Sequence, residues 1–111
     1  MNSEQIKLLS RMKTAIRNNN RRFKRRKDRD INEDLAKIGI TRDIAWDIIL
    51  SLNRNFYYLD TKSYYNQSNY SLTFKRLING KMVYIKLSLE KDNNIDYVYC
   101  WSFHIDYDEY L

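Results

Sequence analysis

The stretch YSLTFKRLINGKMVYIKLSL, residues 70–89, decides the fold of this chain. Apolar and polar side chains alternate on either side of Asn79-Gly80, which is the pattern of two half-buried strands. Because Asn and Gly both accept positive φ, this dipeptide predicts a tight two-residue hairpin, and such a turn fixes the register of its strands. The expected cross-strand pairs are Ile78 with Lys81, Lys75 with Tyr84, Phe74 with Ile85, Thr73 with Lys86 and Leu72 with Leu87.

This register gives the hairpin two different faces, because successive side chains of a strand point to opposite sides. One face is apolar and suits packing against helices; it consists of Leu72, Phe74, Val83, Ile85, Leu87 and Leu89. The other face is polar, aromatic and cationic; it consists of Thr73, Lys75, Tyr84 and Lys86.

Residues 97–105, YVYCWSFHI, predict another strand after a loop of five residues, Glu90 to Asn94. A change of one residue in the length of this loop would move every side chain to the other face. We expect the register that buries the larger aromatic side chains, because burial of apolar surface favours folding. The inward set is then Tyr97, Tyr99, Trp101, Phe103 and Ile105, and the outward set, beside Tyr84 and Lys86, is Val98, Cys100, Ser102 and His104.

Helices are expected in the first half of the chain, where apolar residues recur at helical spacing behind capping residues. They run from Ser3 to about residue 18, from Asp30 or Asn32 to Gly39, and from Thr41 to Leu52. The basic run Arg21 to Lys27 could continue as helix or cross as a loop. Residues 56–59 predict one more strand.

These elements predict an α+β fold with a small antiparallel β-sheet of three to four strands, ending in a C-terminal meander, packed against N-terminal helices. A chain of 111 residues is expected to form a single domain, residues 1–111. Within it we expect a basic N-terminal helix or arm at residues 1–30, helices at 31–53 and the antiparallel sheet at 55–105.

The formal net charge is +6, and the positive residues are concentrated between Arg11 and Arg29. Such a block favours phosphate-bearing partners through counterion release. The alternative interpretation is a solvated helical face or a disordered basic arm.

Cys100 is the one cysteine, which excludes an internal disulfide and a cysteine-based zinc site, and we expect no metal or other cofactor. No apolar run approaches the ~20 residues of a membrane span, and the N-terminus lacks the apolar centre of a signal peptide. We therefore expect a cytoplasmic protein without a membrane partner.

One chemical set stands out on the polar face: the single histidine, His104, with Tyr84, Lys75 and Lys86. Histidine exchanges protons near neutral pH, and lysines stabilise negative charge, so this set could cut RNA without a metal. Taken singly, a strand-end histidine more often satisfies a carbonyl, the tyrosine is more often packed, and the lysines are more often solvated.

Two segments resemble the C-terminal half of MqsR-type toxins of bacterial type II toxin–antitoxin systems: NGKMVYIKL at residues 79–87 and CWSFH at residues 100–104. The helix from Gly39 to Leu52, followed by Phe56-Tyr57, is similar to the same family's helix and next strand. The resemblance covers about residues 35–105. It implies a RelE-like fold and metal-independent mRNA cleavage restrained by a cognate antitoxin. Tyr84 matches the family's strand tyrosine, and His104 stands where the family has a Lys or His.

We therefore expect an mRNA endoribonuclease in which a ribose 2′-OH attacks the adjacent phosphate, with His104 and Tyr84 in acid/base or positioning roles and Lys75 and Lys86 stabilising charge. Exposed tyrosines would stack on bases and the basic run would hold phosphates. The expected RNA-binding residues are Arg21, Arg22, Lys24, Arg25, Arg26, Tyr58, Tyr64 and Tyr65.

The alternative is a protein without catalysis: a phage or mobile-element inhibitor on a toxin-like scaffold, for example anti-CRISPR-like. It would bind a nucleic-acid-handling host nucleoprotein complex through the Arg11 to Arg29 region. A DNA-binding regulator is disfavoured, because the helix from Thr41 carries Asp43 and Asp47 where a recognition helix needs positive charge.

Overall fold

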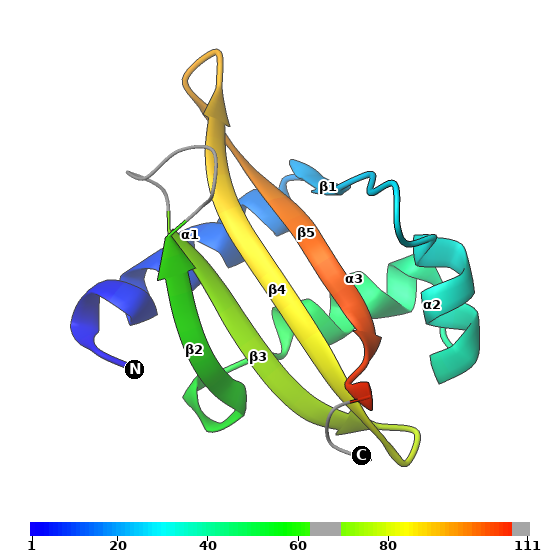
Figure 1. Cartoon of the computed structure of the whole chain (residues 1–111). Coiled ribbons are helices and arrows are strands. Elements are labelled where there is room, and N and C mark those ends of the chain that lie inside the picture. Colours follow the sequence, from blue (N-terminus) through cyan, green and yellow to red (C-terminus); the bar gives the residue numbers. More distant parts are fainter. Residues whose placement is uncertain (63–69, 108–111) are drawn as a thin grey trace.

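The computed structural model describes residues 1–62 and 70–107 (Figure 1). Its elements are α1 (Ser3–Arg17), β1 (Arg21–Phe23), α2 (Ile31–Ile38), α3 (Arg42–Leu50), a 3-10 turn (Arg54–Phe56), β2 (Tyr57–Lys62), β3 (Tyr70–Ile78), β4 (Lys81–Asp92) and β5 (Ile95–Ile105). In this described part the strands form one five-stranded sheet in the order β1-β5-β4-β3-β2. The α+β class is confirmed. The expected sheet of three to four antiparallel strands is wrong, because β1 is added and pairs with β5 in parallel.

Polar side chains cap the helices close to the predicted positions. At α1 the cap is Asn2 rather than Ser3: its side chain accepts a hydrogen bond from the Gln5 amide at 2.9 Å, and the Gln5 side chain accepts one from the Asn2 amide at 2.8 Å. This reciprocal capping box satisfies two backbone donors at once. Asp30 caps α2 and Thr41 caps α3, as the sequence predicts.

The β3–β4 hairpin has the predicted register. The turn residues Asn79 and Gly80 both have positive φ, 51° and 79°. All five expected cross-strand pairs are present. The expected apolar face is buried in full, with Leu72, Phe74, Val83, Ile85, Leu87 and Leu89 all in the core.

The connection from β4 to β5 is tighter than expected. It is a two-residue turn in which Asn93 and Asn94 both have positive φ, 51° and 64°. Asparagine tolerates this conformation better than most residues, because its short polar side chain can hydrogen-bond locally. The five-residue loop predicted from Glu90 to Asn94 is therefore wrong.

A β-bulge divides β5 into two halves. Lys86 pairs with Ser102 but Leu87 pairs with Cys100, so Trp101 is the extra residue of β5 at this point. An extra residue on one strand reverses the alternation of its side chains relative to the partner strand.

The predicted faces of β5 are consequently correct on one side of the bulge and wrong on the other. After the bulge, Phe103 is buried opposite Ile85, and His104 pairs with Tyr84. Before the bulge, the residues expected outside, Val98 and Cys100, are buried. Tyr97 and Tyr99, expected inside, are paired with Glu90 and Ser88 and are only partly buried. Trp101, also expected inside, is partly buried on the other side, where its Nε1 donates a hydrogen bond to Ser88 Oγ. The bulge lets small apolar side chains fill the core while the tyrosine hydroxyls keep access to water.

Strand β1 is formed by residues whose sequence gives no strand signal. Arg21, Arg22 and Phe23 lie parallel to Val98, Tyr99 and Cys100. The Phe23 ring packs against Trp46 of α3, with ring centroids 4.8 Å apart. This contact fixes the segment on the apolar side and sends Arg22 to the opposite side.

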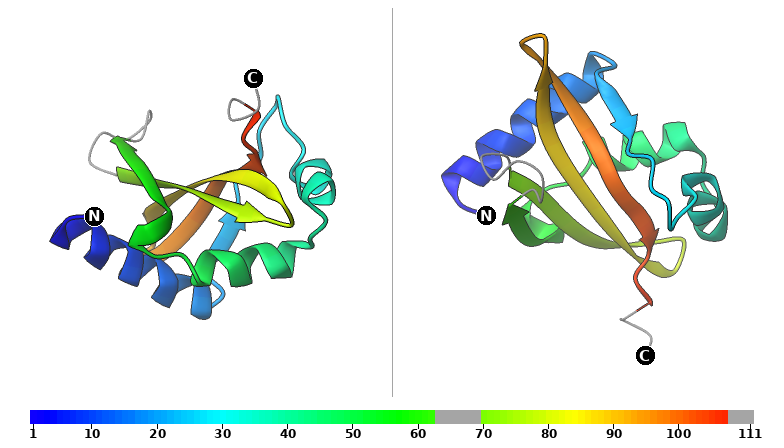
Figure 2. Two further views of the ribbon diagram at one scale, coloured as in Figure 1. Left: turned by 90° about the horizontal axis from the view of Figure 1, so that it is seen from below. Right: turned by 45° about the horizontal axis from the view of Figure 1, so that its top comes forward.

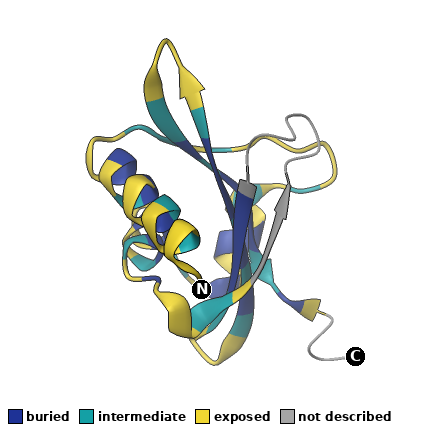
Figure 3. Cartoon of the chain, turned by 90° about the vertical axis from the view of Figure 1, so that its left-hand side faces the viewer, coloured by how far each residue is buried: buried dark blue, intermediate teal, exposed yellow. Residues whose placement is uncertain are grey.

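Helices α1 and α3 lie against one face of the sheet, and α2 lies beside β5 (Figure 2). The core between them includes Met12 and Ile16 of α1, Ile49 of α3, and Phe74 and Phe103 of the sheet. Figure 3 shows buried positions in the middle of the strands and an exposed tip of the β4–β5 hairpin. We call the other side of the sheet, which carries Tyr84, Lys86 and His104, the open face.

None of the helices in residues 1–62 and 70–107 has the length and apolar character needed to cross a membrane.

Candidate functional site

Tyr84 of β4 and His104 of β5 form the centre of the open face. They are direct cross-strand partners, and their rings are stacked, with centroids 5.4 Å apart and an interplanar angle of 19°. The sequence predicts that both side chains lie on this face. Their direct pairing was not predicted, because it depends on the two-residue turn after Asp92 and on the bulge.

His104 is held in a defined orientation and protonation state. Its Nδ1 lies 2.9 Å from the Ile105 carbonyl oxygen, which can only accept a hydrogen bond, so Nδ1 is the donor and Nε2 is left as an acceptor. Burial lowers the pKa of the His104 imidazole, and the positive charges of Arg29 and Arg26 lower it further, against the opposing effects of the Ile105 carbonyl and Asp34. A neutral imidazole with an available Nε2 is the form that accepts a proton.

Lys86 and Arg26 form a cationic pair beside these rings. Arg26 donates a hydrogen bond from Nη1 to Ser102 Oγ at 3.1 Å, and Ser102 is the cross-strand partner of Lys86. The pKa of Lys86 is lowered by burial and by the charge of Arg26. Among the described residues, no carboxylate lies within ion-pair distance of Lys86. Arg26 is exposed and forms a bidentate ion pair with Asp28, with nitrogen–oxygen distances of 3.2 Å, so its charge is matched within the chain. A bound anion would therefore stabilise chiefly the partly desolvated charge of Lys86.

Lys75 reaches the open face but its charge is matched within the chain. Its Nζ lies 2.7 Å from Asp106 Oδ2 and 4.0 Å from the centroid of the Tyr58 ring. Asp106 is almost fully buried. Asp106 follows β5 directly, at the start of an acidic segment, and was not among the predicted site residues. Lys75 is thus a weaker source of positive charge for a bound phosphate than Lys86.

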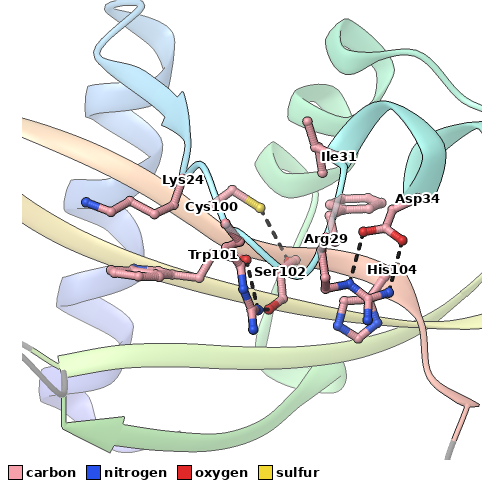
Figure 4. Close-up of a pocket in the computed structure, with 10 residues that line it drawn as sticks. Lys24, Arg29, Ile31, Asp34, Cys100, Trp101, Ser102 and His104 are labelled. Carbon is pink, nitrogen blue, oxygen red and sulfur yellow. Dashed lines mark hydrogen bonds and ion pairs between the residues drawn. The ribbon is translucent and has the colours of Figure 1, made fainter.

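A small pocket lies next to His104, between β5 and the segment that leads into α2 (Figure 4). Arg29 forms a bidentate ion pair with Asp34 there, with nitrogen–oxygen distances of 2.9 and 3.1 Å. This pair closes one side of the pocket and places the Arg29 charge near the imidazole. Neither Arg29 nor Asp34 was predicted as a site residue, because the contact depends on how α2 docks beside β5.

The predicted RNA-binding residues separate into groups. Arg22, Lys24 and Arg26 lie along β5 on the open face. Arg21 instead packs on Trp46 and lies 3.9 Å from Asp43 of α3. Arg25 is exposed and, together with Lys27 and Arg42, lines a larger depression that adjoins the pocket beside His104 and shares Arg26 and Arg29 with it. Tyr58 is exposed beside Lys75, and Tyr64 and Tyr65 lie outside the described residues.

Metal-ligating groups do not gather anywhere in the described ranges: no cluster of three or more His, Cys, Asp or Glu side chains is present there. Cys100 is buried in the core, and burial raises the pKa of its thiol, so it is held as the unreactive thiol.

No protein-family model matches the chain, and the search of curated proteins finds no match. The resemblance to MqsR-type toxins accordingly stays a prediction from short sequence segments.

Proposed function

We propose that this protein is a metal-independent endoribonuclease that acts on mRNA. The observation that carries the proposal is the Tyr84–His104 pair, in which an imidazole of lowered pKa lies beside Lys86, a cation that no described carboxylate pairs with, and near Arg26, which is paired with Asp28. RNA supplies its own nucleophile, the 2′-OH, so cleavage needs only a base, an acid and positive charge around the phosphate.

In the proposed reaction, His104 Nε2 accepts the proton of the 2′-OH as its oxygen attacks the adjacent phosphorus. The bond from phosphorus to the 5′-oxygen breaks, and that oxygen takes a proton from the Tyr84 hydroxyl, which is restored from water. The products are a 2′,3′-cyclic phosphate and a 5′-hydroxyl. His104 then returns its proton to water, so the step is balanced without a further reactant.

Lys86 and Arg26 stabilise the negative charge that develops on the phosphate oxygens. The partly desolvated charge of Lys86 is stabilised when a phosphate binds, and this interaction strengthens as charge accumulates in the transition state, whereas Arg26, paired with Asp28, contributes less. Lys75 contributes less charge, because Asp106 neutralises it. Its role is to hold Tyr58 and the C-terminal end of β5 in place.

The resemblance to MqsR-type toxins supports the same assignment. On the basis of this resemblance we extend the proposal to a RelE-like fold, to action on mRNA in the cytoplasm and to control by a cognate antitoxin. The α+β class and the position of Tyr84 on the central strand are consistent with that family.

The test is cleavage of a mixed-sequence mRNA in EDTA by the wild type, His104→Ala and Lys86→Ala. The expected loss for His104→Ala is about 10²- to 10⁴-fold, the usual contribution of a general base. Lys7→Ala is the matched control for Lys86→Ala, because Lys7 is an exposed lysine on α1, outside the site. Full activity in His104→Ala, in a protein that remains folded, would refute the assignment.

A second candidate is the inhibitor that binds a nucleic-acid complex without cleaving it. The observation in its favour is the depression lined by Arg25, Lys27 and Arg42, which extends the positive surface away from Tyr84 and His104 while sharing Lys24, Arg26 and Arg29 with the pocket beside His104. For this function, charge reversal at Arg25 and Lys27 would abolish binding to the host complex, and His104→Ala would have no effect. For the ribonuclease, His104→Ala would abolish the activity, and charge reversal at Arg25 and Lys27 would have the smaller effect.

A further inference from the structure

A row of contacts between positive and aromatic side chains follows β5 along the open face. The Arg22 guanidinium carbon lies 4.9 Å from the centroid of the Tyr97 ring. The Lys24 ammonium lies 5.0 Å from the ring centroids of both Tyr99 and Trp101. Arg26, which donates a hydrogen bond to Ser102, continues the row toward His104. We call these six residues the β5 row: Arg22, Lys24, Arg26, Tyr97, Tyr99 and Trp101.

The β5 row is a consequence of the parallel strand and the bulge together. Parallel pairing of β1 with β5 places alternate residues, Arg22 and Lys24, on the same side as Tyr97 and Tyr99. Trp101 follows Tyr99 on that side by the same alternation, and the bulge then brings Ser102 and His104 to it. Alternate residues of a strand are ~7 Å apart, so the aromatic rings recur at about the spacing of nucleotides in an extended strand.

The aromatic rings are partly buried, and the cations over them are exposed. Tyr97, Tyr99 and Trp101 are half-buried, and Trp101 Nε1 donates a hydrogen bond to Ser88 Oγ at 2.8 Å. Arg22 and Lys24 are exposed. A cation–π contact at an exposed site is weak, so an incoming base can displace the cation from the ring. The displaced cation then lies beside the phosphate of the same nucleotide.

We propose that the β5 row is a track for single-stranded RNA, which binds with about one nucleotide per aromatic ring and leads the strand into the Tyr84–His104 site. The proposal rests on the proposed function for its choice of RNA and of the cleavage point. A single strand is required because stacking on protein rings uses base faces that a duplex keeps covered. Fixed aromatic rings that alternate with basic side chains are how proteins bind single strands without reading sequence.

The test is fluorescence anisotropy of a labelled single-stranded RNA, with His104→Ala as the uncleaving background of the full chain. Tyr99→Leu should weaken binding roughly 5- to 150-fold, the effect of one lost base stack. Tyr107→Leu, an exposed tyrosine beyond β5, should not change it. Lys24→Ala should weaken binding, and its control is Lys7→Ala. The same RNA in a duplex should bind more weakly to every variant.

Equal affinity for the duplex, or unchanged binding in both Tyr99→Leu and Lys24→Ala, would overturn the track. An acidic peptide that binds more tightly than the RNA, through Lys24 but not through Tyr99, would overturn it as well.

The outcomes separate the two proposals: if the wild type does not cleave RNA but Tyr99→Leu weakens binding, the track stands and the catalytic assignment fails. If cleavage depends on His104 but neither binding nor cleavage depends on Tyr99, the catalytic assignment stands and the track fails.

Discussion

At the scale of single residues, the chemistry of the site depends on the state of His104. Its Nδ1 is engaged by the Ile105 carbonyl, and partial burial with Arg29 and Arg26 nearby disfavours the imidazolium. The folded protein therefore holds the ring as a base over a wider pH range than a free histidine. In the proposed reaction, the positive charges of Arg29 and Arg26 would also attract the phosphate of the RNA.

The pH dependence of cleavage follows from that state. Because the pKa of His104 is lowered, the rate should stay high as the pH falls to the ordinary histidine value of about 6.5 and drop only below it. In Arg26→Gln the midpoint should move to higher pH, since one of the charges that lower the pKa is removed. Single-turnover rates across the acid range measure both midpoints. A wild-type midpoint above the ordinary histidine value would contradict this account.

Removing the charge of Lys75 and removing the charge of Lys86 should change the free energy of unfolding by different amounts. Lys75→Met leaves the buried Asp106 carboxylate without its ion-pair partner and should destabilise the fold by about 3 kcal/mol. Adding Asp106→Asn should recover much of this loss. Lys86→Met is the matched control and should cost little, because no described carboxylate pairs with Lys86. Urea unfolding measures all three variants, and equal losses for the two lysines would show that the Asp106 pair does not matter.

At the scale of elements, the predictable parts of the sheet are those governed by a local signal. Asn79-Gly80 fixes the register of β3 and β4 up to Leu72–Leu87. The pairing of His104 with Tyr84 depends in addition on the bulge in β5, which shifts the β4–β5 pairs by one residue. The bulge at Trp101 has no such signal, because it depends on which residues of β5 best fill the core beneath them. Strand β1 was also unpredictable, since its pairing depends on the Phe23–Trp46 contact between distant segments.

The Asn79-Gly80 turn makes a prediction about the backbone alone. Gly80 has φ 79°, and a Cβ added there would meet no atom within 4 Å. Gly80→Ala should therefore destabilise the protein only through the left-handed conformation, by about 1–2 kcal/mol. Lys7→Ala, at an exposed position of α1, should lie within about 0.5 kcal/mol of the wild type. Thermal unfolding of both variants checks this, and an unchanged Gly80→Ala would show that the turn tolerates another conformation.

At the scale of the whole molecule, the residues that stabilise the fold and the residues of the proposed site lie on opposite faces of the sheet. Helices α1 and α3 bury one face of the sheet, which leaves Tyr84, His104 and the β5 row on the other (Figure 1). The sequence predicts the helices, the basic segment and the chemical set on β4 and β5. It does not predict that the basic segment lies along β5, so the link between the positive residues and the Tyr84–His104 pair came only from the three-dimensional arrangement.

The central claim is that the open face cuts RNA through the 2′-OH without a metal. The most direct measurement is the chemistry of the RNA ends that the wild-type protein produces in EDTA. The account predicts 2′,3′-cyclic phosphates and 5′-hydroxyls, absent when His104→Ala replaces the wild type. Ends with a 3′-hydroxyl, or intact RNA in the presence of protein that binds it, would contradict the account.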